Sequence, residues 1–259
     1  MARRFITLIC EICGREFEAG ARRKTVHCRE CAEELRRKGR GPIQIMKTAP
    51  ATSLHNNLPL KGPVKGICWE QAESDLAYYL KRFNRFPTYD GVTPPDLDRI
   101  TDEDRQLANK IAARMSAKTW RQIIGSSIAQ VGDWDLLNMT DLEWQDRKEI
   151  IRGVLGPLLG HPGIGAARLT KALHRKRPKL IPICDSVVLE AMGVELRSKA
   201  DAVISCMDRL RAIGREHLST LKSLRESSRQ LHSDMTELRI LELLCWVQFG
   251  PFSPPHQKD

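Results

Sequence analysis

Residues 161–188 read HPGIGAARLTKALHRKRPKLIPICDSVV. The stretch contains a glycine pair around one apolar residue, a helical run, a cluster of positive charge, a short apolar run and one acid, Asp185. An amphipathic helical pattern ends just before it, and a second helix is predicted to begin at Ala166. We place the resulting helical hairpin at residues 147–176 and predict a mainly helical body around it.

The turn of this hairpin is built on glycine. Gly163 and Gly165 flank Ile164, so the backbone can turn tightly while the isoleucine plugs the space between the two helices. The N–H groups of the turn and of the new helix N-terminus then face outward as a cradle for a phosphate oxygen. Ordinary connections between antiparallel helices also use glycines in this way, which leaves a purely structural turn as the alternative.

Basic residues follow the second helix, and the whole chain is basic. We expect Arg175, Lys176 and Arg177 to contact phosphates beside the hairpin, with His174 and Lys179 nearby. The 259 residues carry a formal net charge of +10, which favours nucleic acid over membrane as the partner. No window approaches the roughly 18 apolar residues of a membrane span, and the N-terminus lacks a signal-peptide core. We therefore expect a bacterial protein of the cytoplasm, associated with the nucleoid.

The head of the chain, residues 1–40, carries two CxxC pairs. Four thiolates on two tight turns suit one structural Zn²⁺, and the predicted ligands are Cys10, Cys13, Cys28 and Cys31. Short strands at 15–17 and 24–26 and a helix after Cys31 make the module similar to treble-clef or zinc-ribbon folds. Two redox dithiols are the alternative, which fits less well because neither pair opens a βαβ pattern.

Residues 41–66 are rich in Pro, Gly, Asn and Thr and read as a linker. From Trp69 to the C-terminus the body, 67–259, is predicted to be all-helical, with a loop at 84–98 and slight strand evidence at 180–183. Thr101 and the acids after it predict a helix start. The expected helices are 69–83, 104–124, 127–137, 140–159, 165–175, 185–193, 198–213, 214–231 and 234–248.

Two segments together, HPGIG and IPICDSVV, resemble the core of the helix-hairpin-helix DNA glycosylase superfamily, the endonuclease III and adenine glycosylase relatives. In that superfamily an LPGVG-like turn is followed, at the spacing found here, by an essential aspartate, which corresponds to Asp185. The resemblance covers residues 147–192. The KRPKLIPICDSVV segment also resembles uncharacterised bacterial proteins, from which no activity follows.

The resemblance implies a chemical role for Asp185. Cleavage of an N-glycosidic bond builds positive charge on the sugar, and a carboxylate near the anomeric carbon stabilises that state and orients water. The base must first leave the stack. The alternative is that Asp185 is a plain N-cap of the next helix, since Asp is a favoured cap; one residue can also do both.

The chain departs from the family pattern in several places. The lysine that forms a Schiff base in bifunctional members is replaced by Ala167, and Lys171, one turn further on, is expected to be a surface residue. No efficient lyase activity is therefore expected. Val187 stands where relatives often have His. The scattered Cys68, Cys184, Cys206 and Cys245 read as small core residues, so no iron–sulfur cluster is expected.

An amide side chain on an early helix probes the opened duplex in these relatives, and Asn109 is the candidate here, with Ser116 and Lys118 competing. The Trp side chains fall on apolar stripes, so we assign them to the core rather than to base stacking. The sequence thus predicts a monomeric, monofunctional DNA glycosylase that acts on a modified or damaged base of double-stranded DNA, in repair or in defence against phage. The alternatives are a non-catalytic zinc-finger DNA-binding protein and a zinc-headed protein adaptor.

Overall fold

The computed structural model describes residues 5–9, 16–20, 64–83, 85–195 and 199–251. The chain divides into two compact units, Met1–Asn57 and Leu58–Asp259. In the first unit, strand β1 (Phe5–Ile9) pairs antiparallel with β2 (Glu16–Gly20), and Leu8 lies opposite Phe17. The predicted strand at 15–17 thus falls partly within β2, but its partner β1 precedes the first cysteine pair and is not the predicted strand at 24–26. The predicted strand at 24–26 lies outside the described residues.

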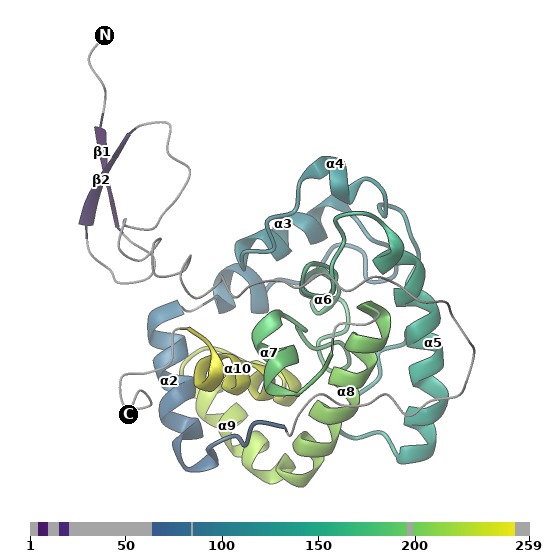
Figure 1. Ribbon diagram of the computed structural model, residues 1–259. Helices are drawn as coiled ribbons and strands as arrows, with labels where there is room; N and C mark the ends of the chain where they lie inside the picture. The colour runs from purple at the N-terminus through teal and green to yellow at the C-terminus, as the bar shows by residue number, and fades with distance from the viewer. Residues whose placement is uncertain (1–4, 10–15, 21–63, 84, 196–198, 252–259) are drawn as a thin grey trace, which may run out of the picture. The chain divides into compact units, whose positions relative to one another are not determined.

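The second unit is mainly helical, as the sequence predicts (Figure 1). Short turns of 3₁₀ and π type at Trp69–Gln71 and Phe86–Asp90 flank the first long helix. The helices are α2 (Ala72–Phe83), α3 (Asp102–Lys110), α4 (Ala117–Trp120), α5 (Asp141–Gly160), α6 (Ala166–Leu173), α7 (Ser186–Ala191), α8 (Lys199–Glu216), α9 (Leu218–Gln230) and α10 (Glu237–Phe249).

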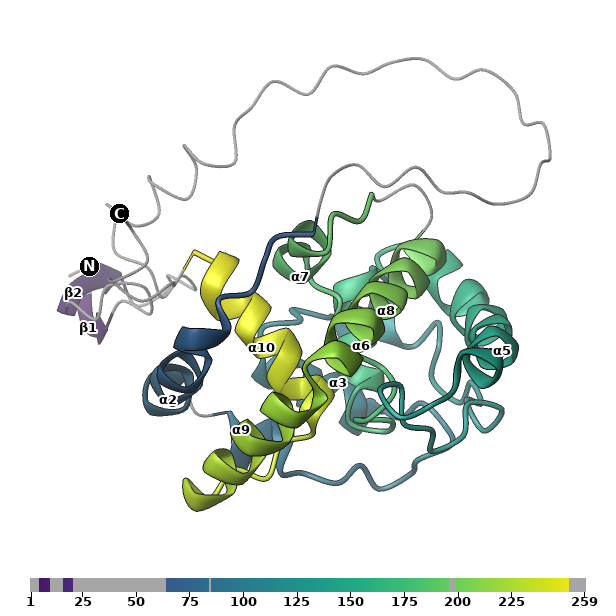
Figure 2. The same ribbon diagram turned by 90° about the horizontal axis from the view of Figure 1, so that it is seen from below.

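Helix α10 lies at the centre of this body and contacts α2, α7, α8 and α9 (Figures 1 and 2). Its sequence, ELRILELLCWVQF, has no polar face, which is typical of a helix covered on all sides. Nine of its thirteen residues are buried, including Arg239 and Glu242. Two charged side chains in the core must be neutralised there, and their partners define the site described below.

The helix starts follow the capping signals in the sequence. Thr140 caps α5: its hydroxyl accepts from Glu143 N, and Glu143 bonds back to Thr140 N at 2.8 Å. Thr101 N likewise donates to the Asp104 carboxylate at the start of α3, as predicted. The predicted linker ends against the body, since Lys65 N donates to Ala191 O and Val64 packs on the core.

Three predicted elements are wrong. The helix expected at 104–124 is broken into α3 and α4, because the Asn109 side chain bonds Met115 and Ser116 starts a new helix by accepting from Thr119 N. Residues 127–137 form turns rather than a helix, and 180–183 form no strand. In these runs the contacts of the folded chain override the intrinsic propensity of the sequence for a helix or strand.

The side chains assigned to the core are mostly there. Trp120 and Trp144 are buried, and Trp69 and Trp134 pack partly against the core. Cys184, Cys206 and Cys245 are buried, whereas Cys68 is exposed, contrary to expectation. No helix within the described ranges has both the length and the hydrophobicity that crossing a bilayer requires.

Candidate active site

The connection between α5 and α6 has the shape expected from its glycines. Gly163 adopts φ +79°, a left-handed conformation that favours glycine, and a Cβ there would lie 3.0 Å from Thr119 Cγ2. Ile164 is completely buried between the helices, as predicted. Lys199 donates to the carbonyls of Leu159 and Ile164, at 3.0 and 2.9 Å, and so ties the turn to α8.

The outward side of this turn retains N–H groups. The hydrogen bonds recorded for the described residues include none from the N–H of Gly163, Gly165 or Ala166. Gly165 is the N-cap of α6 and has no side chain to satisfy these donors. The turn therefore offers unpaired main-chain donors next to the positive end of a helix, an arrangement that can bind an anion.

Asp185 is the N-cap of α7. Its Oδ1 accepts hydrogen bonds from Val187 N and Val188 N, both at 3.1 Å. The capping alternative is thus confirmed. Within the described part of the chain no hydrogen bond is recorded to Oδ2, and the residue is only partly buried. One carboxylate oxygen therefore shapes the fold, while the other remains available to a ligand.

Three buried side chains fix the segment that precedes Asp185. His174 Nδ1 lies 2.7 Å from Ile181 O, and Thr170 Oγ1 accepts from Cys184 N at 3.0 Å. Glu242 of α10 accepts from Ile183 N. These contacts anchor the segment to α6, the helix that starts at the glycine turn, and to the central helix α10.

Behind this segment lies a buried polar network. Arg239 Nε donates to Asp90 Oδ1 at 2.8 Å, and its Nη1 donates to Glu242. The Arg239 guanidinium also lies 5.8 Å from the centre of the Tyr89 ring, on which Arg175 packs at 5.7 Å. The Tyr89 hydroxyl donates to Lys171 O at 2.6 Å. The network thus joins the 86–90 turn, α6 and α10 around the support of Asp185.

Burial perturbs the ionisable groups of this network. Burial raises the pKa of Glu242 to about 7, although the Arg239 guanidinium opposes the shift. Burial, together with the charges of Arg239 and Arg175, holds the pKa of His174 well below its ordinary value. His174 is therefore a neutral ring at physiological pH. Its Nδ1 faces a carbonyl, which can only accept, so Nδ1 carries the proton.

The basic cluster after α6 serves the fold instead of facing solvent, which corrects the prediction that it contacts DNA. Lys176 is 2% exposed; it pairs with Asp104 at 2.9 Å and donates to Asp96 O and Arg99 O. Arg177 is 4% exposed and donates to three carbonyls and to Asp98.

Arg175 is partly buried and donates twice to Val92 O, at 3.1 and 2.8 Å. Like its two neighbours, it supplies donors to an irregular segment whose carbonyls have no regular secondary structure to pair with. Only Lys179 of the sequence-predicted cluster is exposed, because His174 is buried too. This could not be predicted, since Lys and Arg residues that bind carbonyls cannot be told from those that bind phosphates in a sequence alone.

Two further predicted roles change. The Asn109 amide donates to Met115 O and accepts from Met115 N, at 3.0 and 2.8 Å, so it holds a loop and is not free to probe a duplex. Lys171 is not the expected surface lysine: it is partly buried and donates to Ile111 O at 3.0 Å. Burial lowers the pKa of Lys171, while the Asp185 carboxylate acts in the opposite direction.

The glycine turn and α6 carry basic side chains but no acid. Between Glu149 and Asp185 the sequence contains no acid, so Asp185 is the first carboxylate after α5, the turn and α6. Thr170, Glu242 and the role of His174 in holding Ile181 were not predicted from the sequence. Glu242 was detectable, because an acid in a helix with no polar face must have a buried partner.

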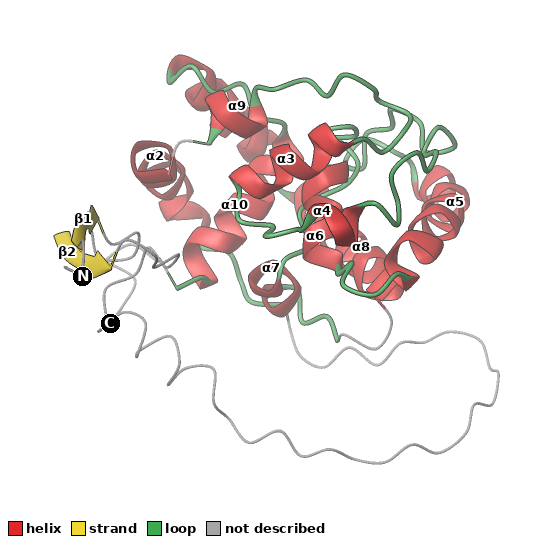
Figure 3. Cartoon of the chain, turned by 90° about the horizontal axis from the view of Figure 1, so that it is seen from above, coloured by secondary structure: helices red, strands yellow, loops and turns green. Residues whose placement is uncertain are grey.

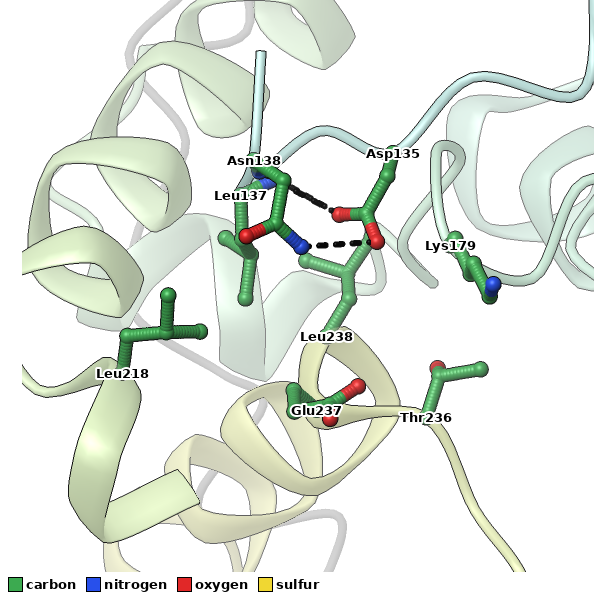
Figure 4. Close-up of a pocket in the computed structure, with 8 residues that line it drawn as sticks. All are labelled: Asp135, Leu137, Asn138, Lys179, Leu218, Thr236, Glu237 and Leu238. Atoms are coloured by element: carbon green, nitrogen blue, oxygen red, sulfur yellow. Dashed lines mark hydrogen bonds between the residues drawn. The ribbon is translucent and has the colours of Figure 1, made fainter. Parts of the chain in front are cut away.

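The structure also has a small hollow, which involves other residues than these (Figure 4). Asn138 and Asp135 face each other across one side and are joined by two hydrogen bonds. The hollow encloses no space for a water molecule, whereas typical small-molecule sites measure roughly 300–1,000 Å³. It involves neither the turn nor Asp185, and we assign it no role.

The predicted zinc ligands Cys10, Cys13, Cys28 and Cys31 lie outside the described residues. Within the described ranges, no group of three or more His, Cys, Asp or Glu side chains is arranged to hold a metal ion. The zinc module therefore stays a prediction.

Comparison with known protein families gives a match over the helical body. A model of a family of unknown function (DUF6308) matches residues 72–249, more than half of the chain. The match runs from the first residue of α2 to the last of α10 and includes the glycine turn, Asp185 and the buried network. Neither the curated proteins nor the solved structures gave a match. The chain belongs to the family of unknown function DUF6308.

Proposed function

We propose that this protein is a monofunctional DNA glycosylase, which hydrolyses the N-glycosidic bond of a flipped, modified or damaged base in double-stranded DNA and leaves an abasic site. The observation that carries the proposal is the state of Asp185. One of its oxygens caps α7, the other has no recorded partner in the described part of the chain, and its support is pinned to the helix that follows the glycine turn.

The proposed chemistry uses the glycine turn and the Asp185 carboxylate. The main-chain N–H groups of the turn bind a phosphate and hold the duplex, which sets the position of the extruded nucleotide. The Asp185 carboxylate stabilises the positive charge that builds on the sugar as the base leaves, and it orients the attacking water. A rigid support favours this role, because a carboxylate displaced by even 1 Å loses most of its effect.

Water is the proposed nucleophile. Ala167 offers no amine, and the Lys171 ammonium is occupied by Ile111 O. Borohydride should consequently trap no covalent complex between the protein and a duplex with a preformed abasic site. A trapped adduct that disappears in Lys171→Ala would overturn attack by water.

The four-cysteine module is proposed to add a separate, cationic DNA contact. The excised base is proposed to come from one of two sources, either ordinary damage (oxidised, alkylated or deaminated bases) or the hypermodified cytosine of phage DNA. A monomer suffices, because the turn and Asp185 belong to one chain.

A non-catalytic DNA-binding protein is the second candidate, and one observation favours it: Asp185 has a complete structural role as a helix cap. In that case the turn and the head bind DNA, and the carboxylate does no chemistry.

The deciding experiment incubates the full chain with duplexes that carry different modified bases and with phage genomes, followed by alkaline cleavage of abasic sites. Asp185→Asn keeps a capping oxygen, so it should preserve folding and DNA binding while abolishing product. Glu190→Gln on the exposed side of α7 is the matched control and should keep activity. Product that persists in Asp185→Asn would eliminate the proposed mechanism, and binding without product on any substrate would favour the second candidate.

A further inference from the structure

The loop between α3 and α4 has a strained backbone. Ala112 and Arg114 have φ values of 62° and 52°, in the left-handed region that residues with a side chain rarely adopt. Ala113 and Met115, the residues that follow each of them, are buried, with exposed fractions of 5% and 3%. Along the loop, exposed and buried residues therefore alternate. Strain of this kind persists only where the surroundings enforce it, and it is concentrated at functional sites.

Several side chains enforce this conformation. Asn109 bonds both the N–H and the carbonyl of Met115. From α6, Lys171 donates to Ile111 O, and Arg168 Nε donates to Ala113 O at 3.2 Å. The loop is thus held by donors from helices on either side of it, and its outward residues have a fixed position.

The same bracing connects the loop to the glycine turn. Arg168 Nη1 donates to Gly163 O at 2.7 Å, so one guanidinium joins the two segments. On the other side of the loop, α4 packs against the turn: Thr119 faces Gly163, and Gln122 Nε2 donates to Pro162 O at 3.2 Å. Figures 1 and 3 show α3, α4 and α6 side by side.

The outward side of this segment is positively charged. Lys110, Arg114, Lys118 and Arg121 are all exposed, and within the described part of the chain no hydrogen bond or ion pair is recorded for their side chains. The sequence contains no acid from 105 to 132. Elsewhere in the body many arginines are paired with carboxylates, for example Arg225 with Asp234. The positive charge of this face is therefore not neutralised by neighbouring carboxylates and is available to an external partner.

We propose that residues 110–121 form a second contact surface for the phosphate backbone of double-stranded DNA, continuous with the glycine turn and centred on Arg114. The inference rests on the DNA partner of the proposed function and adds the surface that positions the duplex beside Asp185. Main-chain donors of the turn grip one phosphate, and the rigid loop and α4 contact neighbouring phosphates through side-chain cations.

The test measures binding of a labelled duplex to the full chain at several salt concentrations. The combined variant Arg114→Ala, Lys118→Ala and Arg121→Ala should weaken binding at least tenfold near 100 mM salt. Its slope of log K against log salt should fall by about 2–3, since each phosphate contact contributes roughly 0.9. The control Lys81→Ala, Arg85→Ala and Lys222→Ala removes the same charge from exposed positions elsewhere and should change the slope little.

Two comparisons separate position from net charge and binding from catalysis. Arg114→Lys should restore most of the affinity lost in Arg114→Ala. Equal losses in the two combined variants, or an unchanged slope in the first, would overturn this surface even if abasic product still forms. If the slope of log K against log salt falls as expected but no substrate yields abasic product, the contact surface is supported and only the proposed hydrolysis is ruled out.

Discussion

Lys176 and Asp104 form an ion pair that is completely removed from solvent: Nζ and Oδ2 are 2.9 Å apart, and both side chains are 0% exposed. The pair connects the segment that follows α6 to the first turn of α3. Its position explains why this lysine of the basic cluster is not available at the surface. Removing one member of such a pair leaves the other charge buried without compensation.

Lys176→Met should therefore destabilise the protein by about 3–5 kcal/mol in chemical denaturation. Lys179→Met, an exposed neighbour, should change stability by less than about 0.5 kcal/mol. If Lys176→Met were as stable as the natural protein and lowered the salt dependence of DNA binding, the original assignment of Lys176 to phosphate contact would be restored.

Ala112→Gly should stabilise the protein by about 0.5–1 kcal/mol, because glycine adopts the left-handed conformation without the steric cost that alanine carries. The control is Ala77→Gly on the exposed face of α2, where ordinary helical geometry makes glycine destabilising by about 1 kcal/mol. Both values come from urea denaturation. A loss of stability in Ala112→Gly would mean that the loop is not strained.

Glu242 should make stability depend on pH. Its pKa is raised to about 7 in the folded protein, so the folded state holds a proton that the unfolded state releases near its ordinary value. This contribution is fully present below about pH 4.5 and is lost as the pH rises through about 7. His174 acts in the opposite sense: its pKa is depressed, so its contribution is present above about 6.5 and lost as the pH falls below that value.

The variant Glu242→Gln separates the two effects. Relative to Glu242→Gln, the natural protein should lose stability between pH 5 and pH 7.5, by an amount on the order of 1–3 kcal/mol. Denaturation curves of both proteins at the two pH values give this difference directly. Parallel pH profiles would show that Glu242 does not titrate in this window.

The head should bind one zinc ion per chain, because two CxxC pairs supply four thiolates. Elemental analysis of the purified full chain measures the stoichiometry, and Cys10→Ser or Cys31→Ser should remove most of the metal. Cys68→Ser is the matched control, as an exposed cysteine of the body. Zinc retained in both head variants would rule out the four-cysteine site.

The glycine turn and the capping of α7 were predictable because each depends on a local rule. Gly163 needs a left-handed φ, and an aspartate before a helical run is a favoured N-cap. The break after Lys110 was not predicted, because Ala112 and Arg114 are good helix formers. Besides the bonds of Asn109 and Ser116, two of the contacts that override this propensity come from Arg168 and Lys171, far along the chain.

The supports of Asp185 were equally hidden. Thr170 and His174 read as ordinary positions of an amphipathic helix, and their partners are main-chain groups that carry no sequence signature. Glu242 was the exception, since an acid inside the run LELL signals a buried partner without naming it.

The hairpin turn and the loop between α3 and α4 both depend on Arg168. Its single guanidinium donates to Gly163 O and Ala113 O, so the two segments share one anchor in addition to the anchors that each has alone. The effects of substitutions on the two sides are therefore expected to be non-additive: once this arginine is lost, further substitutions in either segment have less structure to disrupt. Epistasis between distant sequence positions is the signature that such a joint leaves in a lineage.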